Sequence, residues 1–215
     1  VGFAGMVKNG KILKAPNISD FDNKNLQRDL EKIFLAEVIV KNDAELAGLG
    51  EATFGAGKNY KILGYITWST GIGGAKIVNK KIEDNFFGFE PGHSLFLISP
   101  YNIFSDKIYF EEVEKILGGK YIEKIFDKKP EEIKDRKFWK TLTKIFAGFL
   151  VNVSLFWSCE VIIVGGSFIK SIDFDELKIN FENLKTMPVK TKILKSKLKD
   201  RPVLYGGLFY AKNFL

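Results

Sequence analysis

The amino-acid sequence predicts an α/β fold. β-rich runs alternate with helical patterns along the chain, as expected when helices pack on the faces of a sheet. Hydrophobic residues make up 46% of the 215 residues, which is enough for the core of one large domain or two small ones. Two predicted strands run into glycine-rich turns, at residues 69–75 and 162–168. Such turns would suit a nucleotide held at strand ends.

The first elements are short. Two apolar stretches flank the dipeptide Asn9-Gly10, which is the strongest short signal for a β-hairpin. A helix is predicted over residues 23–34, with Leu26, Leu30 and Ile33 on one face.

Buried elements follow this helix. Residues 36–43 (AEVIVKND) predict a buried strand that ends in polar residues, and residues 44–55 predict a helix rich in small side chains. Small side chains allow that helix to lie close to its neighbours. Residues 60–82 predict two β-rich runs around a glycine-rich turn.

The second half of the sequence predicts longer helices. Residues 110–126 are helical in pattern, with a break at Gly118-Gly119. A helix that is apolar nearly all round towards its end is predicted over residues 130–158, and we expect it to be central. Residues 160–168 predict a buried strand that enters a Gly-Gly turn, and residues 202–214 predict a final helix.

Composition and charge restrict the class of protein. The longest apolar runs are far shorter than the ~20 residues that cross a bilayer, and no leader sequence is recognisable, so we expect a soluble, cytoplasmic protein without a membrane partner. The net charge of +7 is concentrated in residues 185–202, which contain no aromatic residue. This favours a solvated face, or a rim that attracts a nucleotide, over a nucleic-acid site, with polyanion binding as the alternative.

Several kinds of catalytic or metal site are disfavoured. A closed zinc site needs four Cys or His ligands, and the chain has one of each, Cys159 and His93, so no zinc is expected. The sequence lacks a G-x-S-x-G elbow, and the P-loop-like stretch at 55–59 lacks the required glycine at Ala52 and has Asn59 in place of Ser or Thr.

The glycine-rich and acidic motifs are open to two interpretations each. Residues 69–75 are either a tight hairpin turn or a phosphate cradle, and Asn42-Asp43 is either a helix N-cap or a site where Asp43 accepts a hydroxyl proton. Glu90, His93 and Glu114 are weak candidates alone. Together with Asn42 and Asp43 they supply the donors and acceptors that a ring of sugar hydroxyls requires.

These motifs resemble the ROK family of sugar kinases and sugar-responsive repressors. The resemblance runs from about Val1 to Ala211 and rests on these stretches, in order: PNI, VIVKNDAELAGLGEATFGAG, YITWSTGIGGAKIVNKKI, FEPGH, VEKILGGKYIEKIF and VIIVGGSF. It implies a two-lobed actin-like ATPase (ribonuclease H-like) fold with sugar in the central cleft and ATP on glycine-rich turns. We expect residues 1–43 to belong to the N-terminal lobe and residues 44–215 to form the C-terminal lobe.

The resemblance also implies roles for individual residues in ATP-dependent phosphorylation of a hexose or amino sugar, with Mg²⁺. Asp43 resembles the base that takes the proton of the attacking hydroxyl, and its position at a helix N-terminus is expected to lower its pKa. Sugar-hydroxyl ligands are implied at Asn42, Glu90, His93 and Glu114. The phosphate turn matches at Ser69, Thr70, Gly71 and Gly73, and the adenosine-side turn matches at Gly165 and Gly166. A homodimer is also implied.

The sequence departs from the family pattern in three places. The family's zinc motif is missing, so His93 is expected to bind sugar without zinc. Ser69 and Ala75 stand where glycine is common. The Asp-x-Gly-Gly-Thr segment on the family's first strand is absent, so we expect either part of a longer kinase whose first N-terminal strands are missing here, or a degenerate homologue that senses sugar without phosphorylating it. Retention of Asp43 and both glycine turns favours the first.

Overall fold

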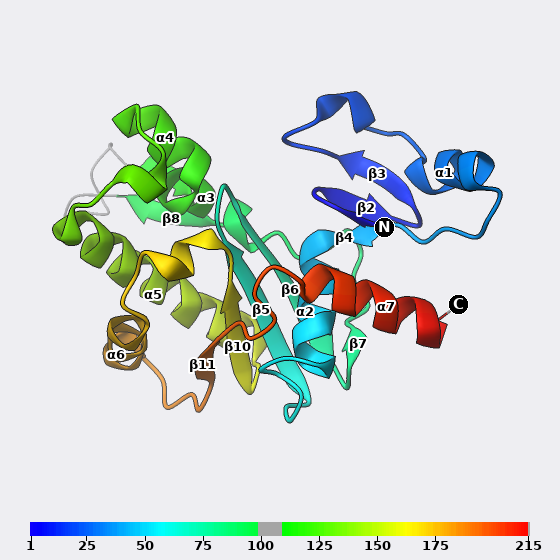
Figure 1. The fold of residues 1–215 in the computed structure, drawn as a ribbon. Helices are drawn as coiled ribbons and strands as arrows, with labels where there is room; N and C mark the ends of the chain where they lie inside the picture. Colours follow the sequence, from blue (N-terminus) through cyan, green and yellow to red (C-terminus); the bar gives the residue numbers. More distant parts are fainter. Residues whose placement is uncertain (99–108, 215) are drawn as a thin grey trace.

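A five-stranded mixed sheet with helices on both faces forms the centre of the protein (Figure 1). The computed structural model describes residues 1–98 and 109–214. The strand order is β11-β10-β5-β6-β7, with β10 parallel to both β11 and β5, and with β5, β6 and β7 antiparallel. The strands are β5 (Ile62–Trp68), β6 (Ile72–Val78), β7 (Lys81–Ile82), β10 (Val161–Gly165) and β11 (Lys192–Lys195). The predicted α/β class is confirmed.

Strand β10 shows why the sheet is covered on both sides. Its residues are all buried, and they alternate between two hydrophobic clusters. Ile162 and Val164 face the cluster that includes α5 (Arg136–Trp157) and α6 (Phe174–Leu184), whereas Val161 and Ile163 face α2 (Asp43–Thr53) and α7 (Pro202–Phe214). A strand buried on both faces is a continuous apolar run, which is why its sequence predicted it correctly.

The N-terminal part forms two small sheets beside this centre (Figure 1). The predicted hairpin is confirmed, because β2 and β3 are antiparallel and Asn9 and Gly10 both have positive φ, as a type I′ turn requires. A small core of Ile12, Ala15 and Val40 lies beneath it. The elements are β1 (Gly2–Phe3), β2 (Met6–Lys8), β3 (Lys11–Lys14), η1 (Ser19–Phe21), α1 (Leu26–Phe34) and β4 (Lys41–Asn42).

Two N-terminal predictions need correction. The predicted strand over 36–43 is reduced to β4, because its parallel partner β1 has only two paired residues. Helix α1 begins at Leu26, where the Asn25 side chain caps it, and Ile33 is 70% exposed instead of lying on the buried face. The apolar face of this helix is narrower than its sequence indicated.

The region after β7 also differs in part from the prediction. A helical break at Gly118 is confirmed, but the segment predicted as helical from residue 110 begins with a strand that pairs with an earlier one. The central helix starts at Arg136, capped by Asp135, after a short 3-10 turn. These elements are η2 (Pro91–His93), β8 (Leu95–Ile98), β9 (Tyr109–Glu112), α3 (Val113–Leu117), α4 (Gly119–Phe126), η3 (Pro130–Glu132) and η4 (Ser167–Lys170).

Helices α2 and α7 lie in unusually close contact, as the small residues of α2 predicted. A Cβ atom on Gly50 would overlap the carbonyl of Pro202, and one on Gly206 would overlap the carbonyl of Leu46. The two glycines therefore set the distance between the helices. Within residues 1–98 and 109–214, none of the helices combines the length and apolarity needed to cross a bilayer.

Candidate active site

The two glycine-rich turns lie side by side at one edge of the sheet. Strands β5 and β10 are parallel neighbours, so their carboxyl ends meet at the same edge, with Thr67 opposite Gly165. The hydroxyl oxygens of Ser69 and Ser167, one from each turn, are 3.2 Å apart. Two turns almost a hundred residues apart in sequence thus form one surface.

The first turn is a tight hairpin between β5 and β6. The amide of Ser69 donates to the carbonyl of Gly71 at 3.0 Å, and Gly73 already belongs to β6, opposite Thr67. The turn is therefore shorter than the glycine pattern suggested. A Cβ atom on Gly73 would lie 3.2 Å from Cγ2 of Thr67, which is a tight contact, and 3.5 Å from Cβ of Ala44 on α2, which is an ordinary one.

Both sides of this turn are held by hydrogen bonds. A carboxylate oxygen of Glu114 accepts from the amide of Ile72 at 2.8 Å, and a Cβ atom on Gly71 would overlap the same carboxylate. At the start of α4, the amide of Gly119 donates to the carbonyl of Ser69 at 2.9 Å. Glu114, predicted as a sugar ligand, is thus already bonded to the phosphate-turn backbone in this structure.

The second turn needs glycine at both positions. Gly166 has a φ of 96°, and a Cβ atom there would overlap the backbone of Trp68. A Cβ atom on Gly165 would overlap the hydroxyl of Tyr65. The turn therefore passes very close to the end of β5, and Gly166 itself is exposed.

Asn42 and Asp43 start helix α2 beside these turns. The Asn42 side chain caps the helix, since its Oδ1 accepts from the amide of Glu45 at 3.0 Å and its Nδ2 donates to the carbonyl of Gly5 at 2.9 Å. Asp43 is the first residue of the helix, and its Oδ1 accepts from the amide of Ala44 at 2.9 Å. The cap is therefore Asn42 and not Asp43.

Burial raises the pKa of Asp43 above its ordinary value. The amides of Ala44 and of Asp43 itself act in the opposite direction but do not outweigh burial. The expectation of a net lowering of this pKa at the helix N-terminus is therefore wrong, because loss of solvent has a larger effect than the amides.

The segment that contains the single histidine is aimed by close packing. Residues Pro91–His93 form the short helix η2, and a Cβ atom on Gly92 would overlap the carbonyl of Ile72. Phe89 packs edge-on against Trp157, with ring centroids 5.1 Å apart. These contacts hold Glu90 and His93 beside the start of β6.

His93 is hydrogen-bonded to an acid that the sequence reasoning did not single out. Its Nδ1 lies 2.8 Å from Oε2 of Glu112 at the end of β9. Burial lowers the pKa of His93, but the Glu112 hydrogen bond and the charges of Glu114 and Glu90 outweigh burial and raise it overall. Burial raises the pKa of Glu90. The charge of His93 lowers this pKa, and the charges of the nearby acids Glu114 and Asp43 raise it.

These side chains line a cavity of about 290 Å³, called the first cavity below. It brings together nine of the eleven residues that the sequence singled out, from four separate segments of the chain. They are Asn42, Asp43, Ser69, Thr70, Gly71, Gly73, Glu90, His93 and Glu114.

A second cavity, of about 380 Å³, adjoins the first. The two share Asp43, Ala44, Thr67 and Ser69, so Asp43 lies where they meet. Gly166 lines the second cavity, whereas Gly165 lines neither.

Some cavity residues were not predicted. They include Asn17 and Lys120 in the first cavity, and Lys170, Lys199 and Asp200 in the second. Lys120 could have been noticed, because it directly follows the paired glycines that start α4. Lys199 lies within residues 185–202, where the sequence predicted a rim that attracts a nucleotide, but nothing in the sequence distinguished it from the other lysines of that segment.

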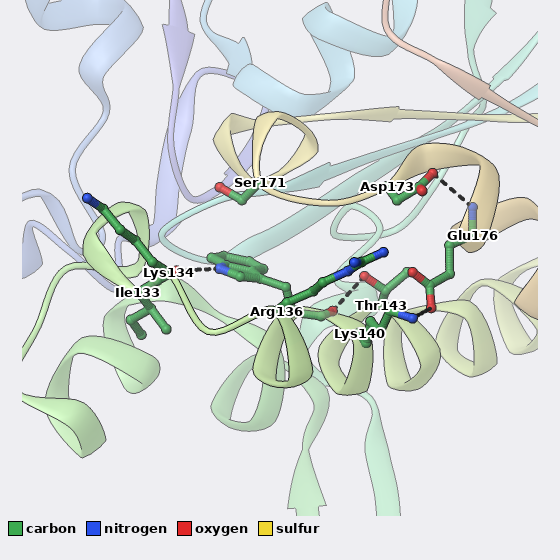
Figure 2. Close-up of a pocket in the computed structure, with 9 residues that line it drawn as sticks. Ile133, Lys134, Arg136, Lys140, Thr143, Ser171, Asp173 and Glu176 are labelled. Carbon is green, nitrogen blue, oxygen red and sulfur yellow. Dashed lines mark hydrogen bonds and ion pairs between the residues drawn. The ribbon is translucent and has the colours of Figure 1, made fainter.

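A larger cavity of about 490 Å³ lies apart from these, between the start of α5 and the start of α6 (Figure 2). Part of its charge is already engaged within the protein. Lys140 and Glu176 are 3.7 Å apart, and Asp173 caps α6. None of the predicted site residues lines it.

A metal site made by protein ligands alone is not formed within residues 1–98 and 109–214. No group of three or more His, Cys, Asp or Glu side chains is placed there to hold an ion. Cys159 is buried, and burial raises the pKa of its thiol to about 11.

Comparison with known proteins places the chain in a family. The ROK family model matches residues 1–213. Glucokinase of Streptomyces coelicolor is 37% identical over 97 residues, which are 43% of this chain and 30% of that protein. The xylose repressor of Bacillus spizizenii is 36% identical over 88 residues, which are 40% of this chain and 23% of the repressor. The matched part thus spans less than a third of either relative.

A solved structure extends the likeness to the whole fold. The inorganic polyphosphate/ATP-glucomannokinase of Arthrobacter sp. strain KM superimposes with a TM-score of 0.72 at 25% identity, over 99% of this chain and 72% of that one. The predicted actin-like ATPase fold is thereby confirmed. Family match, fold and motif order agree, and this chain belongs to the ROK family.

Proposed function

We propose that the protein acts in ATP-dependent phosphorylation of a hydroxyl group of a hexose or amino sugar, with Asp43 as the base. The observation that carries this proposal is the position of Asp43 where the two cavities meet. The first cavity contains carboxylates, an amide and an imidazole that suit sugar hydroxyls, and the second contains lysines and the Gly166 turn that suit phosphates. Glucokinase and glucomannokinase relatives support the reaction class.

The proposed reaction is an in-line transfer. The sugar oxygen attacks the γ-phosphorus, an O–P bond forms, the bond from phosphorus to the ADP oxygen breaks, and the hydroxyl proton moves to Asp43. Its raised pKa strengthens Asp43 as a proton acceptor. Backbone amides of Thr70, Gly71 and Gly166 would contact the phosphates.

We propose that Asn42, Glu90, His93 and Glu114 bind the sugar and that ATP lies along the second cavity. For Glu114 this means holding Ile72 with one oxygen while the other faces the sugar. Mg²⁺ is proposed to arrive with the nucleotide, since the described residues form no metal cluster of their own. The two lobes at 1–43 and 44–215, a homodimer and a cytoplasmic location complete the proposal.

The test follows ADP release from Mg-ATP across a panel of hexoses and N-acetylated amino sugars. Wild type is expected to release ADP only with some sugars. Asp43→Asn is expected to lower kcat by about 10²-fold or more, because the amide cannot accept the proton. Asp84→Asn, which makes the same change outside both cavities, is the control. Equal activity of Asp43→Asn and wild type would exclude Asp43 as the base.

A second function is favoured by the xylose-repressor relative. In this alternative the chain senses a sugar without phosphorylating it. Calorimetric binding of a sugar, with no ADP release under the same conditions from the natural full-length protein, would support the sensor and contradict the kinase.

A further inference from the structure

The buried acid Glu51 is the starting point. It lies on α2, two turns after Asp43, and is 0% exposed. Its Oε2 accepts from the amide of Ala56 at 2.8 Å. No ion pair of Glu51 is found within residues 1–98 and 109–214. A buried carboxylate needs several hydrogen bonds to be tolerated.

The other oxygen of Glu51 holds the loop between β11 and α7. Its Oε1 accepts from the Ser196 hydroxyl at 2.7 Å and from the amides of Lys197 and Leu198 at 2.9 and 2.8 Å. Four donors thus converge on one carboxylate. Glutamine cannot make the same four bonds, because its side-chain NH₂ group would face at least one of these N–H or O–H groups and could not accept a hydrogen bond from it.

Lys199, which follows the two residues bonded to Glu51, has a strained backbone conformation. Lys199 has a φ of 54°, in the left-handed region that side chains other than those of Gly, Asn and Asp seldom adopt. Such a conformation persists where the surrounding structure imposes it, and it often marks a functional site. Here the two residues before Lys199, Lys197 and Leu198, are held through their backbone amides by Glu51.

Lys199 lines the second cavity, together with Lys170 and Gly166. Neither lysine forms an ion pair in the part of the chain that the structure describes. Two lysines without ion pairs that line a cavity reaching Asp43 supply positive charge that suits a chain of phosphates, beside the acids Asp43 and Asp200.

We infer that Lys199 binds the phosphate chain of the phosphoryl donor and that Glu51 is the positioning residue that holds Lys199 in place. The inference rests on the proposed function for the presence of a donor and deepens it by naming a residue. A nucleotide triphosphate and an inorganic polyphosphate share this chemistry, so the test uses both kinds of ligand.

The experiment measures the Kd of ADP and of inorganic tripolyphosphate for the 215-residue chain by calorimetry. Lys199→Gly is expected to weaken both by about tenfold, the loss of one charge-assisted hydrogen bond. It should not lower the unfolding temperature, because glycine adopts positive φ without strain. Lys199→Arg should stay within about threefold of wild type. Lys197→Ala is the matched control, because Lys197 lies on the same loop but lines neither cavity, and it should leave both Kd values unchanged.

Glu51→Gln tests the positioning role. It is expected to weaken ADP binding as Lys199→Gly does, and in the double variant the second change should add little, which a purely structural role would not produce. If Glu51→Gln does not fold, the effect of Lys199→Gly on the two Kd values alone decides whether Lys199 binds the phosphate chain.

Three outcomes would overturn the inference: no binding of either ligand by wild type, unchanged binding by Lys199→Gly, or weakening of ADP binding alone, which would place Lys199 at the nucleoside. A failure of the proposed function is distinguishable. In that case wild type would release no ADP with any sugar, yet binding would still depend on Lys199.

Discussion

His93 shows at the scale of one residue how the fold gives a side chain its character. As the only histidine of the chain, it had the interpretations of metal ligand, catalyst, sugar ligand or buried core residue. The structure places it half-exposed at the first cavity and bonded to Glu112. The Glu112 bond orients the ring, which is what a hydrogen-bonding sugar ligand needs.

The first prediction concerns the pKa of His93. In Glu112→Gln the largest influence that raises the pKa is lost while burial remains, so the pKa should fall below its wild-type value. The ring protons of His93 can be followed by NMR without assignment, because the chain has no other histidine. Glu111→Gln is the control, since Glu111 pairs with Lys115 and not with His93. An unchanged titration in Glu112→Gln would show that the hydrogen bond does not form in solution.

The sign of the effect on stability follows from the direction of the shift. A histidine whose pKa is raised on folding stabilises the protein fully below its unfolded pKa, and this contribution is lost as the pH rises through the folded pKa. Since His93 is partly exposed, we expect the contribution to be small.

At the scale of secondary-structure elements, helix α2 contributes to the site at both of its ends. Its N-terminus carries Asp43, its middle packs on α7 through glycine, and Glu51 near its end holds the Lys199 loop. Any shift of α2 along α7 would therefore move the proposed base and the proposed donor site together.

The second prediction tests this contact. Gly206→Ala would place a methyl group against the carbonyl of Leu46, and we expect it to lower the free energy of unfolding by about 1–3 kcal/mol or more. Gly207→Ala is the control on the same helix, since the nearest atom to its Cβ is 3.9 Å away. It should be neutral or stabilising by up to about 1 kcal/mol. Urea titration measures both, and equal effects would show that the close packing is not required.

At the scale of the whole molecule, the small N-terminal core is separate from the two clusters that flank the large sheet. The N-terminal core contains three buried residues, and its strands pair over only two or three positions. Regions with few buried contacts open most easily.

The third prediction follows. Native-state hydrogen exchange of the amides in β2 and β3 should be faster, by about tenfold or more, than that of the amides in β5 and β10. Mass spectrometry of proteolytic fragments resolves the two regions. Uniform protection across them would indicate one cooperative unit and would contradict separate lobes at 1–43 and 44–215.

Local sequence was sufficient for the elements whose pattern has a single explanation: the Asn9-Gly10 hairpin, strand β10, the break at Gly118 and the small-residue helix α2. It was insufficient where partners decide. The segment 36–43 is apolar enough for a strand but has only β1 to pair with, and β11 lies in a basic segment that showed no strand signal. The motif residues of the site were predicted because each type is chemically distinctive.

The amino-acid sequence alone therefore specified the α/β class and the set of groups available to a sugar and a phosphate donor, because these depend on composition and short-range pattern. Tertiary structure alone decided that nine of those residues line one cavity, that Asp43 has a raised pKa and that Lys199 faces the second cavity. Each of these depends on segments far apart in the chain. Burial, pairing and the Glu51 hydrogen bonds exist only once those segments are packed together.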